Sequence, residues 1–369
     1  MGRLRKLGSD VGGIIDGAVL RALRHRFTRA PQSSAHEVFS AGEHDRRAEL
    51  LEVIAHYEAP ETRASFFARP PHPDATTEQS GTLDGGHVLE LAWPSLYVPS
   101  LPAARDAYLA FEKNRRVRAR AFLHDDPLHD DLPHDVQPRT TIICLHGYQG
   151  GRFFVEERAF SVRWLYGLGC DVVLFALPFH GARRDSDAPS WPSPNPVRSN
   201  EGFGQAIFDL RALVRWLRAR PGAEAQKVAV LGISLGGYTA ALFATTDALD
   251  FVGPMVPMAS WPELLWSHGE GRAERERAEK EGITLPLLQR AMALVSPLER
   301  TPLVTPDRVL VQSARGDRIA PPEHAVRLAQ HFGGVHLAFS GGHVLQLGRR
   351  DAYAAIAQRM ALLGLIPKR

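Results

Sequence analysis

A serine, an aspartate and a histidine follow one another in the C-terminal half of the sequence, each just after a short apolar run. Ser234 lies in Gly232–Gly236, which reads Gly-Ile-Ser-Leu-Gly, while Asp317 follows one apolar run and His343 follows another, Val335–Phe339. A serine hydroxyl becomes a nucleophile when a histidine takes its proton and a carboxylate orients that histidine. The order predicts hydrolysis through an acyl-enzyme on Ser234, with His343 as the base and Asp317 as the orienting acid.

The surroundings of the serine favour a nucleophile elbow over an ordinary turn between a strand and a helix. The apolar run Val228–Leu231 predicts a buried strand, and Tyr238–Ala244 predicts a helix. A tight turn between them leaves no room for a Cβ atom at Gly232 or Gly236. The Ser234 hydroxyl would then stand near the positive end of the helix.

An acyl-transfer site also needs two backbone N–H groups that stabilise the negative charge on the carbonyl oxygen. We expect one from Leu235, the residue after the nucleophile. The loop after an early strand supplies the other, with Tyr148 as first choice and Gln149 as the alternative. His146, in the same loop, is expected to brace the loop and not to react.

The sequence contains 16 histidines, so other bases must be weighed. His180 and His324 are the main competitors of His343. His180 precedes Ser234 in the chain, which favours a structural or substrate-facing part. Beside it, Arg183 is a candidate for lining the substrate site, and the Arg183–Arg184 pair either favours an acidic substrate or faces solvent.

Apolar runs and helical periodicities alternate from Thr140 to the end of the chain. The predicted strands are Thr140–Leu145, Asp171–Leu177, Val228–Leu231, Gly253–Met258, Val309–Gln312 and Val335–Phe339, and the helices are Ala159–Leu168, Asn200–Ala219, Tyr238–Ala244 and Ala352–Leu363. Strands that are apolar throughout and alternate with helices predict an α/β fold, with a mostly parallel sheet covered by helices on both faces. Ligands bind such sheets at the carboxyl ends of the strands.

Upstream, two further strands and two further helices are expected. The strands are His87–Trp93 and Arg116–Leu123, and the helices are Glu43–Tyr57 and Ala104–Asn114. Residues from about 262 to 306 interrupt the later alternation and include a charged, exposed helix. We interpret them as a small helical cap within a hydrolase domain of residues 81–369, preceded by an N-terminal helical extension of residues 1–80.

Residues 1–27 combine basic ends with apolar residues at helical spacing. Asp10 and Asp16 interrupt any signal-peptide core, and Gly12, Gly13 and Gly17 weaken a free helix. The segment is expected to be a helix packed on the domain. A weak contact with a membrane surface is the alternative.

The charge balance, the cysteines and the histidine-rich stretch indicate which partners, compartment and metal to expect. There are 44 basic and 41 acidic residues, a balance that gives no indication of a nucleic-acid partner. Cys144 and Cys170 are expected at opposite ends of the sheet as free thiols, which suits the cytoplasm. The stretch His124–Asp135 is rich in histidine and aspartate and is read as a solvated loop, with a metal site as the alternative. We expect no cofactor and no metal.

Together, these motifs resemble the α/β-hydrolase superfamily. The resemblance rests on His146-Gly147, the Gly232–Gly236 stretch, Gly316-Asp317 and Gly342-His343, in that order. Leu177-Pro-Phe-His-Gly181 is similar to a loop of dienelactone hydrolase-like and acyl-peptidase-like members. The resemblance implies a mostly parallel eight-stranded sheet and hydrolysis without a cofactor.

Several functions remain open at this point. A serine hydrolase acting on a small carboxylic ester or thioester is expected first. An acyltransferase, or a peptidase or amidase, would use the same three residues. A non-catalytic or membrane-associated protein could retain the fold. The oligomeric state is not indicated.

Overall fold

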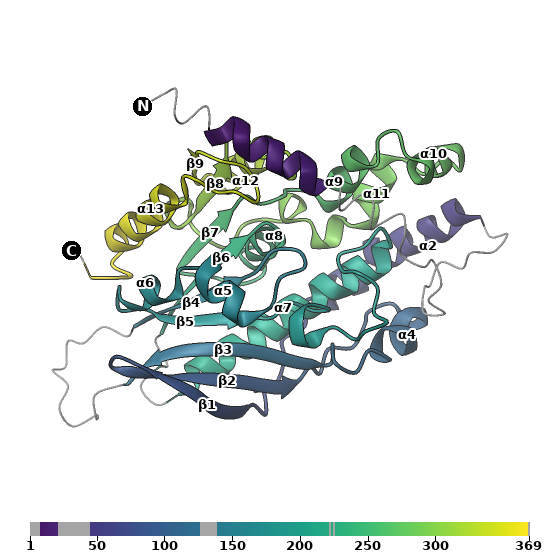
Figure 1. Cartoon of the computed structure of the whole chain (residues 1–369). Coiled ribbons are helices and arrows are strands. Elements are labelled where there is room, and N and C mark those ends of the chain that lie inside the picture. The colour runs from purple at the N-terminus through teal and green to yellow at the C-terminus, as the bar shows by residue number, and fades with distance from the viewer. Residues whose placement is uncertain (1–7, 21–44, 126–138, 221–222, 224–225, 368–369) are drawn as a thin grey trace.

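The fold is built on one central sheet. The computed structural model describes residues 8–20, 45–125, 139–220, 223 and 226–367 (Figure 1). In these residues the sheet has nine strands, in the order β1-β2-β3-β5-β4-β6-β7-β8-β9. The strands are β1 Thr76–Leu83, β2 Gly86–Pro94, β3 Arg116–His124, β4 Thr140–Leu145, β5 Asp171–Phe175, β6 Lys227–Ile233, β7 Phe251–Met255, β8 Leu310–Ala314 and β9 Val335–Phe339.

Six of these strands, from β5 to β9 across the sheet, run parallel to one another. Their side chains alternate between two apolar clusters: in β4, Ile143 and Leu145 join one, and Ile142 and Cys144 the other. This period of two follows from the pleat of a strand. Both faces are covered, which explains why the strands read as continuous apolar runs. The six strands predicted from Thr140 onward are confirmed, with small changes at their ends.

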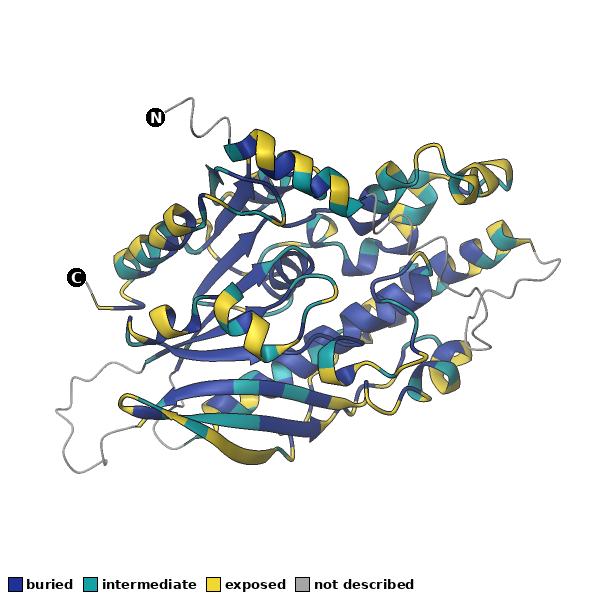
Figure 2. Cartoon of the chain, in the orientation of Figure 1, coloured by how far each residue is buried: buried dark blue, intermediate teal, exposed yellow. Residues whose placement is uncertain are grey.

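Helices cover both faces of the sheet. Helices α7, α8 and α12 share a cluster with one face, while α5, α6 and α13 share a cluster with the other. The bounds are α2 Arg46–Glu58, α3 Pro60–Ser65, α4 Arg105–Leu109, α5 Phe153–Ala159, α6 Val162–Tyr166, α7 Pro196–Arg218, α8 Leu235–Phe243, α9 Trp261–His268, α10 Ala273–Lys280, α11 Leu285–Ala291, α12 Pro322–Phe332 and α13 Arg349–Leu362. The predicted α/β architecture is therefore confirmed, and Figure 2 shows the sheet as its buried centre.

Two helices differ from the sequence prediction. The single helix expected over Ala159–Leu168 is replaced by α5 and α6, because Ser161 adopts φ = 50° and interrupts the helical backbone between them. The helix expected over Ala104–Asn114 is shorter: a 3₁₀ turn leads into α4, which ends at Leu109. α12 was not predicted.

The sheet has one strand more than the eight that the resemblance implied. β1 pairs antiparallel with β2, which pairs antiparallel with β3, and β3 pairs antiparallel with β5. β1 is polar and mostly exposed, so it carries none of the apolar alternation that marks a strand. It spans residue 80, where a boundary was expected, so Thr76–Ser80 is part of the sheet.

Between β7 and β8 the chain forms α9, α10 and α11, where a cap was expected. α10 buries none of its residues, as expected for its charge run. α11 packs on α2 through a small cluster that includes Leu50, Ile54 and Ala291. The N-terminal region is therefore connected to the helices between β7 and β8.

Residues 8–20 form a helix that packs on the protein (Figure 1). The helix does not pack through its apolar side chains, since Val11 and Ile14 are 40% and 64% exposed. The buried face instead contains Gly12, Gly13 and Asp16. The rest of residues 1–27 lies outside the described residues. In the described part of the chain, no helix has the length and apolar character needed to cross a membrane.

The two cysteines are free and buried, as predicted. Cys144 lies near the carboxyl end of β4, whereas Cys170 directly precedes the start of β5. Since β4 and β5 run parallel, the two thiols lie at opposite ends of the sheet.

Candidate active site

Ser234, His343 and Asp317 meet at the carboxyl ends of β6, β9 and β8. The Ser234 Oγ lies 2.8 Å from Nε2 of His343, and Nδ1 of His343 lies 2.7 Å from Oδ2 of Asp317. In the neutral imidazole with its proton on Nδ1, the serine O–H donates to Nε2 and Nδ1–H donates to the carboxylate. The other carboxylate oxygen, Oδ1, accepts the N–H groups of Ile319 and Ala320 at 2.9 and 2.8 Å. The aspartate is thereby fixed from both sides.

The backbone at Ser234 has the strained geometry expected of a nucleophile elbow. Its φ is 57° and its ψ is −113°, a conformation that L residues rarely adopt. A Cβ atom at Gly232 would overlap the backbone of Gly236, and one at Gly236 would overlap the carbonyl of Leu145. Only glycine fits at these two positions, so the turn can close and leave the serine half-exposed at the start of α8.

The imidazole of His343 titrates above its ordinary value. Burial alone would lower its pKa, but the charge of Asp317, the hydrogen bond to it and the charge of Asp16 raise the pKa more. The side chain is 11% exposed and that of Asp317 is fully buried, so the pair interacts with little screening by water. Such a histidine takes up a proton readily, as a general base must.

The loop after β4 lies against the serine. A Cβ atom at Gly147 would stand 3.5 Å from the Cβ of Ser234. Gly150 N–H donates to the Gly147 carbonyl at 3.0 Å, which closes a turn with Tyr148 and Gln149 at its centre. Gln149 has φ = 63°. Leu235 is the first residue of α8, so its N–H has no acceptor within the helix. Leu235 thus follows Ser234 directly, and the loop that carries Tyr148 and Gln149 lies against the serine through Gly147.

His146 connects this loop to the loop after β5. Its Nδ1–H donates to the Gly147 carbonyl at 2.8 Å, and its Nε2 accepts the Leu177 N–H at 3.0 Å. Both ring nitrogens are occupied, which fits the bracing part expected of it. Burial lowers the pKa of His146 to about 4, so the ring stays neutral at ordinary pH.

The competing histidines do not contact the serine hydroxyl. His180 is buried, its Nδ1–H donates to the Pro178 carbonyl at 2.9 Å, and its ring lies 5.0 Å from that of His146. Burial, which is the largest cause, lowers the pKa of His180 to about 3. His324, on α12, accepts the Ala259 N–H at 3.2 Å. His180 is thus a buried residue that packs against the loop after β4.

The expectation that Arg183 lines the substrate site is wrong. The side chain is fully buried, and its guanidinium donates to the carbonyls of Ala176 and Asn114 and to Asp209, the last at 2.7 Å. These donors hold parts of the core together and are not available to a ligand. The residue next to it, Arg184, is exposed.

One residue at the site was not predicted. Asp16, on the helix of residues 8–20, accepts the N–H groups of His343 and Val344 at 2.7 and 3.1 Å. The only sequence signal is the spacing of Ser9, Gly12, Gly13 and Asp16, which puts three small residues and one carboxylate on one helix face.

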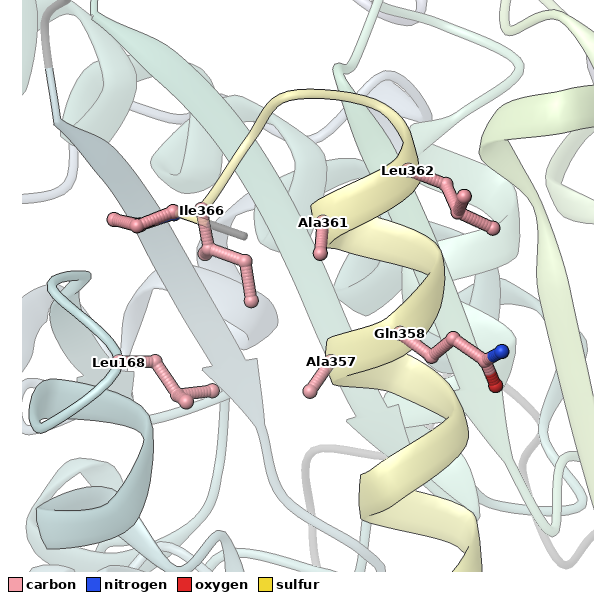
Figure 3. A pocket seen from close by; sticks show the side chains of 7 residues that line it. Leu168, Ala357, Gln358, Ala361, Leu362 and Ile366 are labelled. Atoms are coloured by element: carbon pink, nitrogen blue, oxygen red, sulfur yellow. The ribbon is translucent and has the colours of Figure 1, made fainter. Parts of the chain in front are cut away.

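Among the residues that the structure describes, no group of three or more His, Cys, Asp or Glu side chains could hold a metal ion. Most of the stretch His124–Asp135 lies outside them. Figure 3 shows an open apolar hollow between Leu168 and α13. It lies at the amino end of the sheet, since Leu168 precedes β5, and is therefore remote from Ser234.

A family model and two curated proteins each match part of this chain in sequence. The X-Pro dipeptidyl-peptidase family (S15) matches residues 199–293, a segment that contains Ser234. The uncharacterized protein Rv2627c of Mycobacterium tuberculosis is 29% identical over 244 residues, which are 64% of this chain and 54% of that protein. The uncharacterized protein MT2702, from another strain, matches equally. The chain thus spans about half the length of these curated relatives.

Solved structures of esterases have the same architecture. Acetyl xylan esterase 1 from Thermoanaerobacterium sp. superposes with a TM-score of 0.56 at 15% identity, over 85% of this chain and 98% of that one. Acetyl xylan esterase from Paenibacillus sp. R4 gives a TM-score of 0.58 at 15% identity, over 88% and 96%. At 15% sequence identity, this likeness shows a shared fold and does not show a shared activity. The chain therefore shares the fold of these esterases, the α/β architecture that its motifs indicated.

Proposed function

We propose that the protein is a serine hydrolase that cleaves a carboxylic ester or thioester through an acyl-enzyme on Ser234. The observation that carries the proposal is the continuous chain of contacts from Ser234 Oγ to His343 and on to Asp317, at 2.8 and 2.7 Å. These distances are within the range needed for proton transfer. The strained backbone at Ser234 holds the hydroxyl in that position.

In the first half of the reaction, Nε2 of His343 takes the proton of Ser234 while Oγ attacks the carbonyl carbon. The negative charge on the carbonyl oxygen is stabilised by the N–H of Leu235 and a second N–H from the loop after β4, for which Tyr148 comes before Gln149. The bond to the leaving group then breaks, and His343 returns the proton to the departing alcohol or thiol. Asp317 stabilises the imidazolium throughout.

In the second half, water takes the place of the leaving group. His343 removes a proton from the water, and the hydroxide oxygen attacks the acyl carbon on Ser234. Collapse of the second tetrahedral intermediate returns the proton to Ser234 Oγ and releases the carboxylic acid. If an alcohol or amine replaced water, the outcome would be acyl transfer by the same groups.

A peptidase is the second candidate, and one observation favours it. The family that matches residues 199–293 is described as X-Pro dipeptidyl-peptidase. The match includes Ser234 but ends before Asp317 and His343, so it bears on the nucleophile and its helix. The two solved esterases favour an ester only through their fold.

A substrate panel separates these candidates. We would compare p-nitrophenyl esters of two to eight carbons, the matching acyl thioesters and X-Pro p-nitroanilides, each with wild type and Ser234→Ala. Hydrolysis of the esters or thioesters that is lost in the variant supports the proposal. Cleavage of the anilides alone would replace it with the peptidase, and no Ser234-dependent hydrolysis of any substrate would count against both.

A further inference from the structure

The helix of residues 8–20 packs directly on the two loops that carry the candidate acid and base. Its packing face consists of Ser9, Gly12, Gly13 and Asp16, spaced three and four residues apart. A Cβ atom at Gly12 would overlap the backbone of Gly342, and one at Gly316 would overlap the carbonyl of Ser9. Backbone thus meets backbone, and the helix lies against the segments after β8 and β9 (Figure 1).

Asp16 ends this face and is fully buried. Its Oδ2 accepts the N–H groups of Arg318 at 3.2 Å and His343 at 2.7 Å, and its Oδ1 accepts the Val344 N–H at 3.1 Å. Arg318 follows Asp317, so one carboxylate holds the backbone beside both residues. Hydrogen bonds to an ionised acceptor are stronger than those between neutral groups.

Other hydrogen bonds also join the segment after β8 to β9 and the loop that follows it. The Arg315 N–H donates to the Phe339 carbonyl at 2.9 Å, and the Arg315 guanidinium donates to the Ala338 carbonyl at 2.7 Å. Gly316 N–H donates to the Gly341 carbonyl at 2.8 Å, and His343 donates to Asp317.

Gly341 and Gly342 precede His343, and glycine restricts a backbone least. Inside the loop, the Gly342 N–H donates to the Leu345 carbonyl at 2.9 Å and the Gln346 side-chain amide donates to the His343 carbonyl at 3.0 Å. Asp16 adds contacts to this loop from outside it.

We propose that Asp16 is a positioning residue of the active site, whose carboxylate joins the Asp317 and His343 loops so that the N-terminal helix completes the catalytic geometry. The proposal rests on the proposed function, since it concerns the same triad. Asp16 would act through His343 and not on the substrate. Plain packing would not require a charge at this position, whereas three converging N–H groups do favour one.

Asp16 also contributes to the electrostatics of the base. Two carboxylates act on the His343 ring: Asp317 from the loop after β8, and Asp16 from the helix. The other nitrogen of the ring, Nε2, is hydrogen-bonded to the Ser234 hydroxyl at the start of α8. Removing the charge of Asp16 should therefore lower the pKa of His343, while loss of packing alone should leave it unchanged.

The test compares Asp16→Asn with Asp10→Asn in the full chain. Both variants remove one negative charge from the same helix, but Asp10 is exposed. An asparagine at position 16 keeps the shape and presents an NH₂ group to a backbone N–H. We expect Asp16→Asn to lower kcat about tenfold to a hundredfold with little change in KM, as misplacement of a catalytic group does. Asp10→Asn should match wild type.

The pKa of His343 is measured separately by NMR on ¹³Cε1-histidine protein, with the signal assigned by His343→Gln. Asp16→Asn should shift this pKa downward and Asp10→Asn should not. Equal pKa values in the two variants would overturn the proposal. The titration does not require turnover. It therefore tests whether Asp16 acts on His343 even if no ester is hydrolysed and the proposed function fails.

A second pair of variants covers the case in which Asp16→Asn does not fold. Gly12→Ala should push the helix, and with it the Asp16 carboxylate, away from Gly342 and His343, and so lower both kcat and the pKa of His343. At Gly17 a Cβ atom would meet only the Arg318 guanidinium, at 4.0 Å, so Gly17→Ala should leave both unchanged. If Gly12→Ala behaves like Gly17→Ala, the helix does not position the base.

Discussion

The carboxylate of Asp16 accepts the backbone N–H of His343 at 2.7 Å, although 327 positions separate the two residues in the sequence. The contact makes the N-terminal helix a neighbour of the candidate base. Gly12 and Gly13 allow the close approach that brings the carboxylate to the loop, since a Cβ atom at either position would crowd the backbone of Gly342 or Gly316.

The pH dependence of hydrolysis should report the titration of His343. The imidazole must be neutral to accept the serine proton, and its pKa lies above the ordinary value of 6.5. We therefore expect kcat/KM to fall as the pH decreases, with an apparent pKa above 6.5. His146 and His180, with pKa values of about 4 and about 3, would not titrate in this range. An acid limb with an apparent pKa below 6.5 would contradict the assignment.

Adjacent arginines should differ in their effect on stability. Arg183→Met leaves Asp209 buried without its partner, which should lower the free energy of unfolding by about 3–5 kcal/mol. Arg184→Met changes an exposed side chain and should stay within about 0.5 kcal/mol of wild type. Urea unfolding measures both. A stable Arg183→Met protein with a raised KM for acidic esters would restore the substrate-facing interpretation.

Contact of the N-terminal segment with a membrane surface stays a prediction. Val11 and Ile14 are 40% and 64% exposed on the helix of residues 8–20, where apolar side chains could enter a lipid surface. The change to test is the double substitution Val11→Ser and Ile14→Ser, which leaves Asp16 in place. Wild type should co-sediment with anionic vesicles about twofold or more above the variant. Equal recovery of both proteins with the vesicles would show that Val11 and Ile14 do not mediate contact with a membrane surface.

The sequence predicts the parallel strands and the order of Ser234, Asp317 and His343 because these depend on local apolar runs and short motifs. It misses β1, since an exposed edge strand has no need of apolar residues. Arg183 was expected to line the substrate site because its buried partner, Asp209, is recognisable only once α7 packs against the loop after β5. Asp16 is missed for the same reason: the backbone N–H groups that it binds come from the other end of the chain.

Whether Ser234 is an activated nucleophile can be tested with a fluorophosphonate, which reacts covalently with such serines. We would incubate wild type, Ser234→Ala and His343→Gln with the probe and locate the modified residue by peptide mass spectrometry. We expect labelling at Ser234 in wild type, no labelling in Ser234→Ala, and labelling slowed about a thousandfold or more in His343→Gln, because the serine needs its base. Folded wild-type protein that is not labelled, or labelling that persists unchanged without His343, would contradict the proposal that Ser234 is an activated nucleophile.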